Sequence, residues 1–150
     1  MNISLELNGR RADWDVEPGE ALLDALRRHG VLSVKRGCDT ASCGTCTVLL
    51  DGMPVPSCAV PAPRADGRAV TTVEGLPGEA ARLGACLAAE GADQCGFCAP
   101  GLVVAVVAMS RELTDPDEAA INHYLAGNLC RCGGYVSQTR AIRRYLQEAR

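Results

Sequence analysis

The stretch from residue 37 to residue 58 decides the fold, and it reads Gly37-Cys-Asp-Thr-Ala-Ser-Cys-Gly-Thr-Cys-Thr-Val-Leu-Leu-Asp-Gly-Met-Pro-Val-Pro-Ser-Cys58. Three of its cysteines have the spacing C-x4-C-x2-C, and a fourth follows after eleven residues. This spacing is typical of a plant-type [2Fe–2S] cluster held by four thiolates. Gly37 and Gly44 suit a tight loop around such a core, because glycine tolerates positive φ and leaves room for backbone N–H groups. The expected ligands are Cys38, Cys43, Cys46 and Cys58.

A second set of four cysteines follows in two short motifs. The first motif, residues 94–101, contains Cys95 and Cys98, and the second, residues 128–135, contains Cys130 and Cys132. Each motif lies between two predicted helices, so the four thiols should meet at one end of a helical region. Four thiolates also suit a structural zinc ion, and the sulfur count alone does not separate the two. A C-x-C pair is less usual for zinc, which favours a second iron–sulfur cluster.

The cysteine count and the composition restrict the class of protein. The chain has 150 residues, nine cysteines and a net charge of −3. An odd number of closely clustered cysteines favours metal or cluster ligation over disulfides. The ninth, Cys86, falls on the apolar face of a predicted helix and is expected in the core. The charge gives no basic excess for binding nucleic acid or an anionic membrane surface.

The ends of the chain and its apolar runs bear on its location. Residues 1–7 lack the basic segment and apolar run of a secretory signal. The longest apolar run, residues 102–109, is too short to span a bilayer. We therefore expect a cytoplasmic protein without membrane insertion.

Hydrophobic periodicity changes midway along the chain. Alternating residues and turn signals predict strands at 3–7, 12–16, 46–50, 58–60 and 69–73, with one helix at 21–26. Hairpin turns are expected at Asn8-Gly9 and Asp51-Gly52. Helices are predicted at 79–90, 99–113, 116–126 and 137–148, the third opened by a capping box at 115–118. The sequence thus predicts an α+β chain, with one domain at 1–75 and a small helical bundle at 76–150.

The three cysteine motifs together resemble a known family. Residues 37–58, Gln94-Cys-Gly-Phe-Cys-Ala-Pro-Gly101 and Gly127-Asn-Leu-Cys-Arg-Cys-Gly-Gly-Tyr135 resemble the small iron–sulfur subunit of the xanthine oxidase family of molybdenum hydroxylases. That family includes carbon monoxide, aldehyde, purine and N-heteroaromatic dehydrogenases. The resemblance covers almost the whole chain. Two small departures, Ala99 and Gly133 where threonine is common, remove no ligand.

The resemblance implies an architecture and a set of cofactors. It implies an N-terminal β-grasp, plant-type ferredoxin-like domain followed by a C-terminal four-helix bundle, each with one [2Fe–2S] cluster. The second cysteine set would hold the cluster nearer molybdenum, and the first set the cluster nearer FAD. Gln94 and Cys132 match positions that touch the molybdopterin of a partner subunit.

The same resemblance implies the function. This chain would pass electrons singly from the molybdenum-pterin centre to FAD and would contain no substrate site itself. A large molybdenum-binding subunit, a medium FAD-binding subunit and a dimer of heterotrimers are the implied partners. A free-standing ferredoxin-type carrier and a zinc-binding interaction module are the alternatives.

Overall fold

The strands of the protein precede all but one of the α-helices in the described part of the chain. The computed structural model describes residues 1–148, and residues 149 and 150 of the second predicted domain lie outside the described residues. The strands are β1 (Asn2–Leu7), β2 (Arg10–Asp15), β3 (Thr47–Leu50), β4 (Met53–Pro56) and β5 (Ala69–Thr71). The α-helices are α1 (Leu22–Arg28), α2 (Pro77–Ala89), α3 (Ala99–Glu112), α4 (Glu118–Tyr124) and α5 (Tyr135–Glu148). The predicted α+β class is confirmed.

The five strands form one mixed sheet in the order β2-β1-β5-β3-β4. β1 and β5 are parallel, and the other neighbouring pairs are antiparallel. Both predicted hairpin turns are present, with positive φ at Asn8, Gly9, Asp51 and Gly52. Positive φ at both central residues is what a two-residue type I′ turn requires, and Asn-Gly and Asp-Gly adopt it readily.

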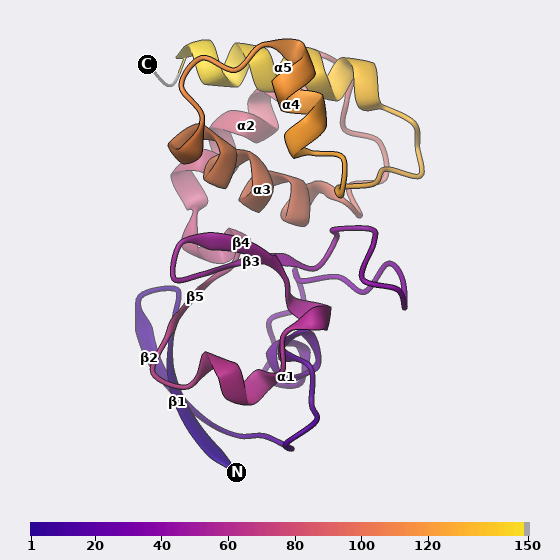
Figure 1. Cartoon of the computed structure of the whole chain (residues 1–150). Helices are drawn as coiled ribbons and strands as arrows, with labels where there is room; N and C mark the ends of the chain where they lie inside the picture. The colour runs from indigo at the N-terminus through magenta and orange to yellow at the C-terminus, as the bar shows by residue number, and fades with distance from the viewer. Residues whose placement is uncertain (149–150) are drawn as a thin grey trace.

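Strand β3 is covered on both faces, which explains its unbroken apolar sequence. Val48 and Leu50 belong to the core that the sheet shares with α1, whereas Leu49 belongs to the core of α2, α3 and α5. Successive strand side chains point to opposite faces, so each face needs its own apolar partner. Figure 1 shows the helices α2–α5 stacked on one side of β3 and α1 on the other.

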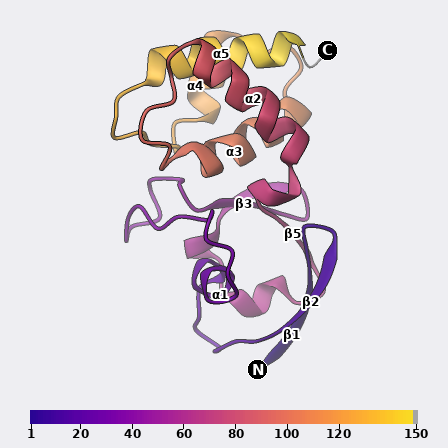
Figure 2. The ribbon, with the colours of Figure 1, turned by 180° about the vertical axis from the view of Figure 1, so that it is seen from behind.

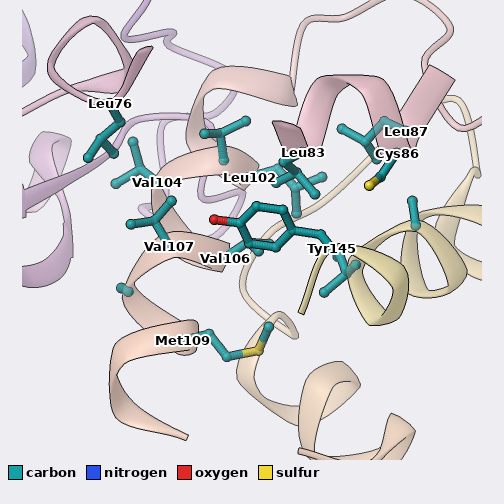
Figure 3. Close-up of a cluster of buried hydrophobic side chains, with 14 of the residues drawn as sticks. Leu76, Leu83, Cys86, Leu87, Leu102, Val104, Val106, Val107, Met109 and Tyr145 are labelled. Carbon is teal, nitrogen blue, oxygen red and sulfur yellow. The ribbon is translucent and has the colours of Figure 1, made fainter. Parts of the chain in front are cut away.

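The helical core is built around α3, whose residues from Gly101 to Met109 are all buried. Figure 3 shows the ring of Tyr145 reaching from α5 into this cluster, near Leu83 of α2 and Val106 of α3. The Arg82 guanidinium lies 5.8 Å from the centre of the same ring. Cys86 is 3% exposed in this core, as its place on the apolar helix face predicts.

Two local predictions are wrong. Residues 58–60 are not a strand, because Ser57–Ala59 forms a 3-10 turn, η1, and the strand β4 lies just before it. Strand β4 was not predicted, because Pro54 and Pro56 cannot donate to a strand ladder. Proline is tolerated at a sheet edge, and β4 lies at the edge. The helix predicted to begin at Pro116 begins two residues later. The N-cap of α4 is Asp117, whose side chain accepts a hydrogen bond from the Ala120 N–H, so Pro116 precedes the helix.

The cysteine-bearing loops lie on the same side of the molecule. Figures 1 and 2 show the loop between α1 and β3 beneath the loops that lead into α3 and α5, and the two opposite views agree. The fold thus brings sequence segments far apart in the chain to one region. Within residues 1–148, no helix has the length and apolar character that crossing a bilayer requires.

Candidate iron–sulfur sites

The first cysteine set comprises Cys38, Cys43, Cys46 and Cys58. The loop before β3 has no regular structure, and its chain reverses where Ala41 and Gly44 have φ values of 56° and 70°. Position 37 has no room for a side chain, because a Cβ there would lie 2.7 Å from Thr45 Oγ1. Thr45 also donates to the Lys35 carbonyl oxygen at 3.2 Å and lies 3.2 Å from the Cys43 sulfur. Thr45 thus closes the loop that curls around the three sulfurs.

Two strand ends bring the last two thiols of this set together. Cys46 precedes β3, and Cys58 lies in the turn η1 that follows β4. Because β3 and β4 pair antiparallel, the two sulfurs lie only 3.4 Å apart. The hydroxyl of Ser57, which is fully buried, donates to the Cys46 carbonyl oxygen at 2.7 Å and fixes this end.

The loop backbone stabilises negative charge on sulfur. Hydrogen bonds from the backbone of Thr40 and Cys43, with smaller contributions from the Cys43 side chain and Ser42, lower the pKa of Cys38 to about 6. Burial, followed by the neighbouring Cys46 thiol, raises the pKa of Cys58 to about 11. The Cys38 side of the site therefore favours thiolate, because several N–H groups point at that sulfur.

The second cysteine set comprises Cys95, Cys98, Cys130 and Cys132. Cys98 is the N-cap of α3, so that helix begins beside the site, with Pro100 in its first turn. Cys130 and Cys132 lie in the loop between α4 and α5, where Gly133 has a φ of 75°. The thiols pair across the two loops, Cys98 with Cys130 and Cys95 with Cys132. All four cysteines line one crevice beside the start of α3.

Burial and backbone hydrogen bonds shift the thiol pKa values of this set in opposite directions. Burial, followed by the Cys130 thiol, raises the pKa of Cys98 to about 11. Burial alone would also raise the pKa of Cys130, but hydrogen bonds from the backbone of residues 132–134 lower it. Cys95 and Cys132 are exposed, so one side of the second set faces outward.

Two residues that sequence reasoning missed support the second set. Gln138 of α5 is 7% exposed and its Nε2 lies 3.9 Å from the Cys98 sulfur, to which it donates. Tyr135 Oη accepts the Cys130 N–H at 2.8 Å. Gln138 lies four residues before the buried Ile142 on α5, and a polar residue on that face was the available signal, because buried polar groups need partners. Hydrogen bonds to ligand sulfurs are a recognised means of setting cluster potential.

Gln94 lies at the outward side of the second set. It is exposed and lines the same crevice as Cys95 and Cys132. Its Nε2 comes within 3.7 Å of the place that a Cβ on Gly134 would occupy. An alanine at position 134 would therefore make only ordinary van der Waals contact with Gln94.

The sulfur arrangement fits a binuclear cluster. Within residues 1–148, no three His, Cys, Asp or Glu side chains converge as they would around one metal ion. The cysteines lie in pairs instead, and a [2Fe–2S] core uses two ligands on each iron. Thiolate donors, pairing and inward-pointing N–H groups together fit two [2Fe–2S] clusters better than a mononuclear zinc site.

Both sets face one cavity. It has a volume of about 500 Å³, and its lining includes Cys38 and Cys43 of the first set and Cys95, Cys98 and Cys130 of the second. On its inner side, the Leu129 N–H donates to the Cys43 carbonyl oxygen at 2.8 Å. The two sites are therefore neighbours in direct contact.

Comparison with known proteins finds two iron–sulfur domain families in the chain. A 2Fe-2S iron-sulfur cluster binding domain matches residues 5–89, and a [2Fe-2S] binding domain matches residues 72–143. The nicotinate dehydrogenase small FeS subunit of Eubacterium barkeri is 40% identical, over 95% of this chain and 93% of that protein. The xanthine dehydrogenase iron-sulfur-binding subunit of Escherichia coli O157:H7 is 42% identical, over 90% of this chain and 87% of that protein.

A solved structure agrees with these relatives. A chain of quinoline 2-oxidoreductase from Pseudomonas putida 86 superposes with a TM-score of 0.91 at 37% identity, covering 99% of this chain and 94% of that one. The chain therefore belongs to the small [2Fe–2S] iron–sulfur subunits of the xanthine oxidase family of molybdenum hydroxylases.

Proposed function

We propose that this chain passes electrons singly from a molybdenum-pterin centre in one partner subunit, through two [2Fe–2S] clusters, to FAD in another. When bound, each cluster accepts and releases one electron, so that a two-electron oxidation is divided into single steps. The observation that carries the proposal is the contact between the two cysteine sets through Leu129 and Cys43. Two adjacent one-electron sites form a relay, whereas a single exposed site would serve a diffusing carrier.

The ligands proposed for each cluster follow the two sets. Cys38, Cys43, Cys46 and Cys58 would hold the cluster nearer FAD. Cys95, Cys98, Cys130 and Cys132 would hold the cluster nearer molybdenum. The pairing of the thiols and the N–H groups around Cys38 and Cys130 support these assignments.

The proposed domains are a β-grasp, plant-type ferredoxin-like domain at 1–75 and a four-helix bundle at 76–150. Two separate hydrophobic cores support this division, one around the sheet and α1 and one around α3. Leu49 belongs to the helical core, so the two cores would meet across the sheet.

The proposed side for the large molybdenum-binding subunit is the outward side of the second set. Gln94 and Cys132, the candidates for contact with molybdopterin, are both exposed there. Large apolar side chains are exposed on the loops and helix start of the same region, namely Phe97, Leu129, Tyr135 and Val136. Clustered exposed apolar residues are typical of a protein interface. A medium FAD-binding subunit and a cytoplasmic dimer of heterotrimers complete the proposal.

Co-purification tests this assignment. We expect an affinity-tagged chain, expressed with its neighbouring reading frames, to purify with a molybdenum-containing chain and a flavin-containing chain. Reduction by the substrate of the complex should then produce two distinct [2Fe–2S] EPR signals. A chain that purifies alone with both clusters intact would instead support the free-standing carrier.

A matched variant tests where the partner binds. Val136→Asp places a charge on the most exposed of the four apolar residues, whose exposed fraction is 72%. It should release the large subunit and leave both clusters bound. Met53→Asp places the same charge at an apolar residue of β4 that is 60% exposed, and it should leave the large subunit bound. Retention of that subunit by Val136→Asp would contradict the proposed side.

A further inference from the structure

A side-chain hydroxyl lies against one sulfur of the first cysteine set. Thr45 Oγ1 is 3.2 Å from the Cys43 sulfur, and it is also 3.2 Å from the Lys35 carbonyl oxygen, to which it donates. A threonine hydroxyl carries a single proton, so it donates fully to only one acceptor at a time. Thr45 therefore has two alternative acceptors, and one of them is a candidate ligand atom.

Gly37 leaves the space in which the hydroxyl and the sulfur meet. A Cβ on Gly37 would lie 2.7 Å from Thr45 Oγ1 and 3.1 Å from the Cys43 sulfur. A side chain there would push against both atoms of the contact. The contact between Thr45 and Cys43 therefore depends on a third residue of the loop, which has no side chain.

Thr45 is also shielded from water, with an exposed fraction of 5%. The start of α3 covers its backbone, since a Cβ on Gly101 would lie 2.5 Å from the Gly44 carbonyl oxygen and 3.0 Å from that of Thr45. The loop between α4 and α5 closes the same side, because a Cβ on Gly44 would overlap the Gly127 carbonyl oxygen. A hydrogen bond in such surroundings is electrostatically stronger than one exposed to water.

The charge on the Cys43 sulfur determines which acceptor the hydroxyl favours. A cysteine that binds a metal does so as a thiolate without a proton, so Thr45 must be the donor of this contact. Hydrogen bonds to an ionised acceptor are stronger than those to a neutral one such as the Lys35 carbonyl oxygen. Reduction adds negative charge at the ligand sulfurs, and it therefore strengthens the bond to Cys43 relative to the bond to Lys35.

Other side-chain donors near the candidate ligands make longer contacts. Ser42 Oγ is 4.0 Å from the Cys38 sulfur, and Ser42 is exposed. In the second set, Gln138 Nε2 is 3.9 Å from the Cys98 sulfur. Of these three donors, Thr45 lies closest to a sulfur. Hydrogen bonds to ligand sulfurs set the potential of an iron–sulfur cluster, so the strongest side-chain contribution is expected from Thr45.

We propose that Thr45 donates its hydroxyl proton to the Cys43 sulfur in the reduced state and thereby raises the reduction potential of the first cluster. The inference rests on the proposed electron-transfer function. In each transfer the first cluster gains the electron that the second one loses. No proton leaves the protein, because the hydroxyl only turns from the Lys35 carbonyl oxygen to the sulfur. A higher potential at the first set favours transfer in the proposed direction, from the second set to the first.

The test is Thr45→Val in the purified heteromeric complex, because valine has nearly the shape of threonine and lacks the hydroxyl. Thr45→Ser retains a hydroxyl and is the rescue variant. The matched control is Thr47→Val, since Thr47 Oγ1 donates to the Gly44 carbonyl oxygen at 2.7 Å and, within residues 1–148, to no sulfur. The readouts are both reduction potentials, from an EPR-monitored titration, and the deuterium hyperfine couplings of the first cluster after exchange into deuterated water.

We expect Thr45→Val to lower the ratio of reduced to oxidised first cluster about fivefold at a fixed potential, which for a one-electron couple is a decrease of about 40 mV. One exchangeable deuterium coupling that the wild type shows should be missing. Thr45→Ser and Thr47→Val should match the wild type in both readouts. The second cluster should keep its potential in every variant.

Iron content shows whether the first cluster is present in each variant. Thr45→Ala, which also removes the hydroxyl, takes the place of Thr45→Val if that variant does not retain the cluster. An unchanged first-cluster potential at full iron content would overturn the role of Thr45 and leave the proposed function standing. An equal shift in Thr47→Val would overturn it too, because the loop and not the sulfur contact would then be the cause. Absence of [2Fe–2S] signals from the wild-type complex would overturn the proposed function itself.

Discussion

Replacing Gln138 by leucine should lower the reduction potential of the cluster held by the second cysteine set. Gln138 Nε2 donates to the Cys98 sulfur across 3.9 Å, and the side chain is 7% exposed. Reduction adds negative charge to the cluster, so a donor to a ligand sulfur stabilises the reduced form more than the oxidised form. Leucine has similar bulk and lacks the donor, so the reduced form loses that stabilisation.

The geometry of this hydrogen bond sets an upper value for the decrease in reduction potential. A net hydrogen bond contributes about 1 kcal/mol, which for a one-electron couple corresponds to about 40 mV. The long N···S distance makes this an upper value, so we expect a decrease of roughly 20–40 mV. The first cluster should keep its potential, because Gln138 lies near Cys98 and Cys130 and bonds to no thiol of the first set.

An EPR-monitored redox titration of the complex measures both potentials in one sample. Gln147→Leu is the matched control, since Gln147 lies on the same helix and is exposed. Iron content should equal that of the wild type in both variants. An unchanged or raised potential of the second cluster in Gln138→Leu, with full iron content, would refute the reasoning.

Three further substitutions test the ligands, the helical core and the tight loop. Cys132→Ser should remove the second cluster and stop turnover while the EPR signal of the first remains; loss of both signals would argue against independent sites. Leu83→Ala, at a fully buried residue, should reduce the free energy of unfolding by about 2–5 kcal/mol. Leu32→Ala, at a residue 56% exposed, should leave that free energy nearly unchanged, and equal effects would contradict the assigned core. Gly44→Ala should lower the melting temperature and the cluster content, whereas Gly19→Ala, with nothing within 4 Å and no positive φ, should change neither; a wild-type melting curve for Gly44→Ala would contradict the close approach.

Features determined by neighbouring residues were predictable. The Asn8-Gly9 and Asp51-Gly52 turns follow from the φ values that these residues adopt readily, and both formed. The cysteine motifs identified the ligand candidates because ligand spacing is a local property. Strand β4 was not predictable, since its two prolines disfavour a strand unless the strand lies at an edge, and edge position depends on the whole sheet.

Contacts between segments that are distant in the chain could not be predicted from the sequence. The sequence pattern placed the thiols of the second set at one end of the helices, but nothing in it joined Leu129 to Cys43. That contact depends on how β3 packs against α3, which brings Gly44 and Gly101 together. Gln138 was missed for the same reason, because its partner Cys98 lies on another helix.

The central claim is that this chain holds two [2Fe–2S] clusters, one in each cysteine set. Iron and acid-labile sulfide analysis, combined with EPR of the anaerobically purified and reduced protein, tests it most directly. We expect a coloured protein with two distinguishable [2Fe–2S] signals and equal amounts of iron and sulfide. A colourless protein that contains zinc and no acid-labile sulfide would contradict it.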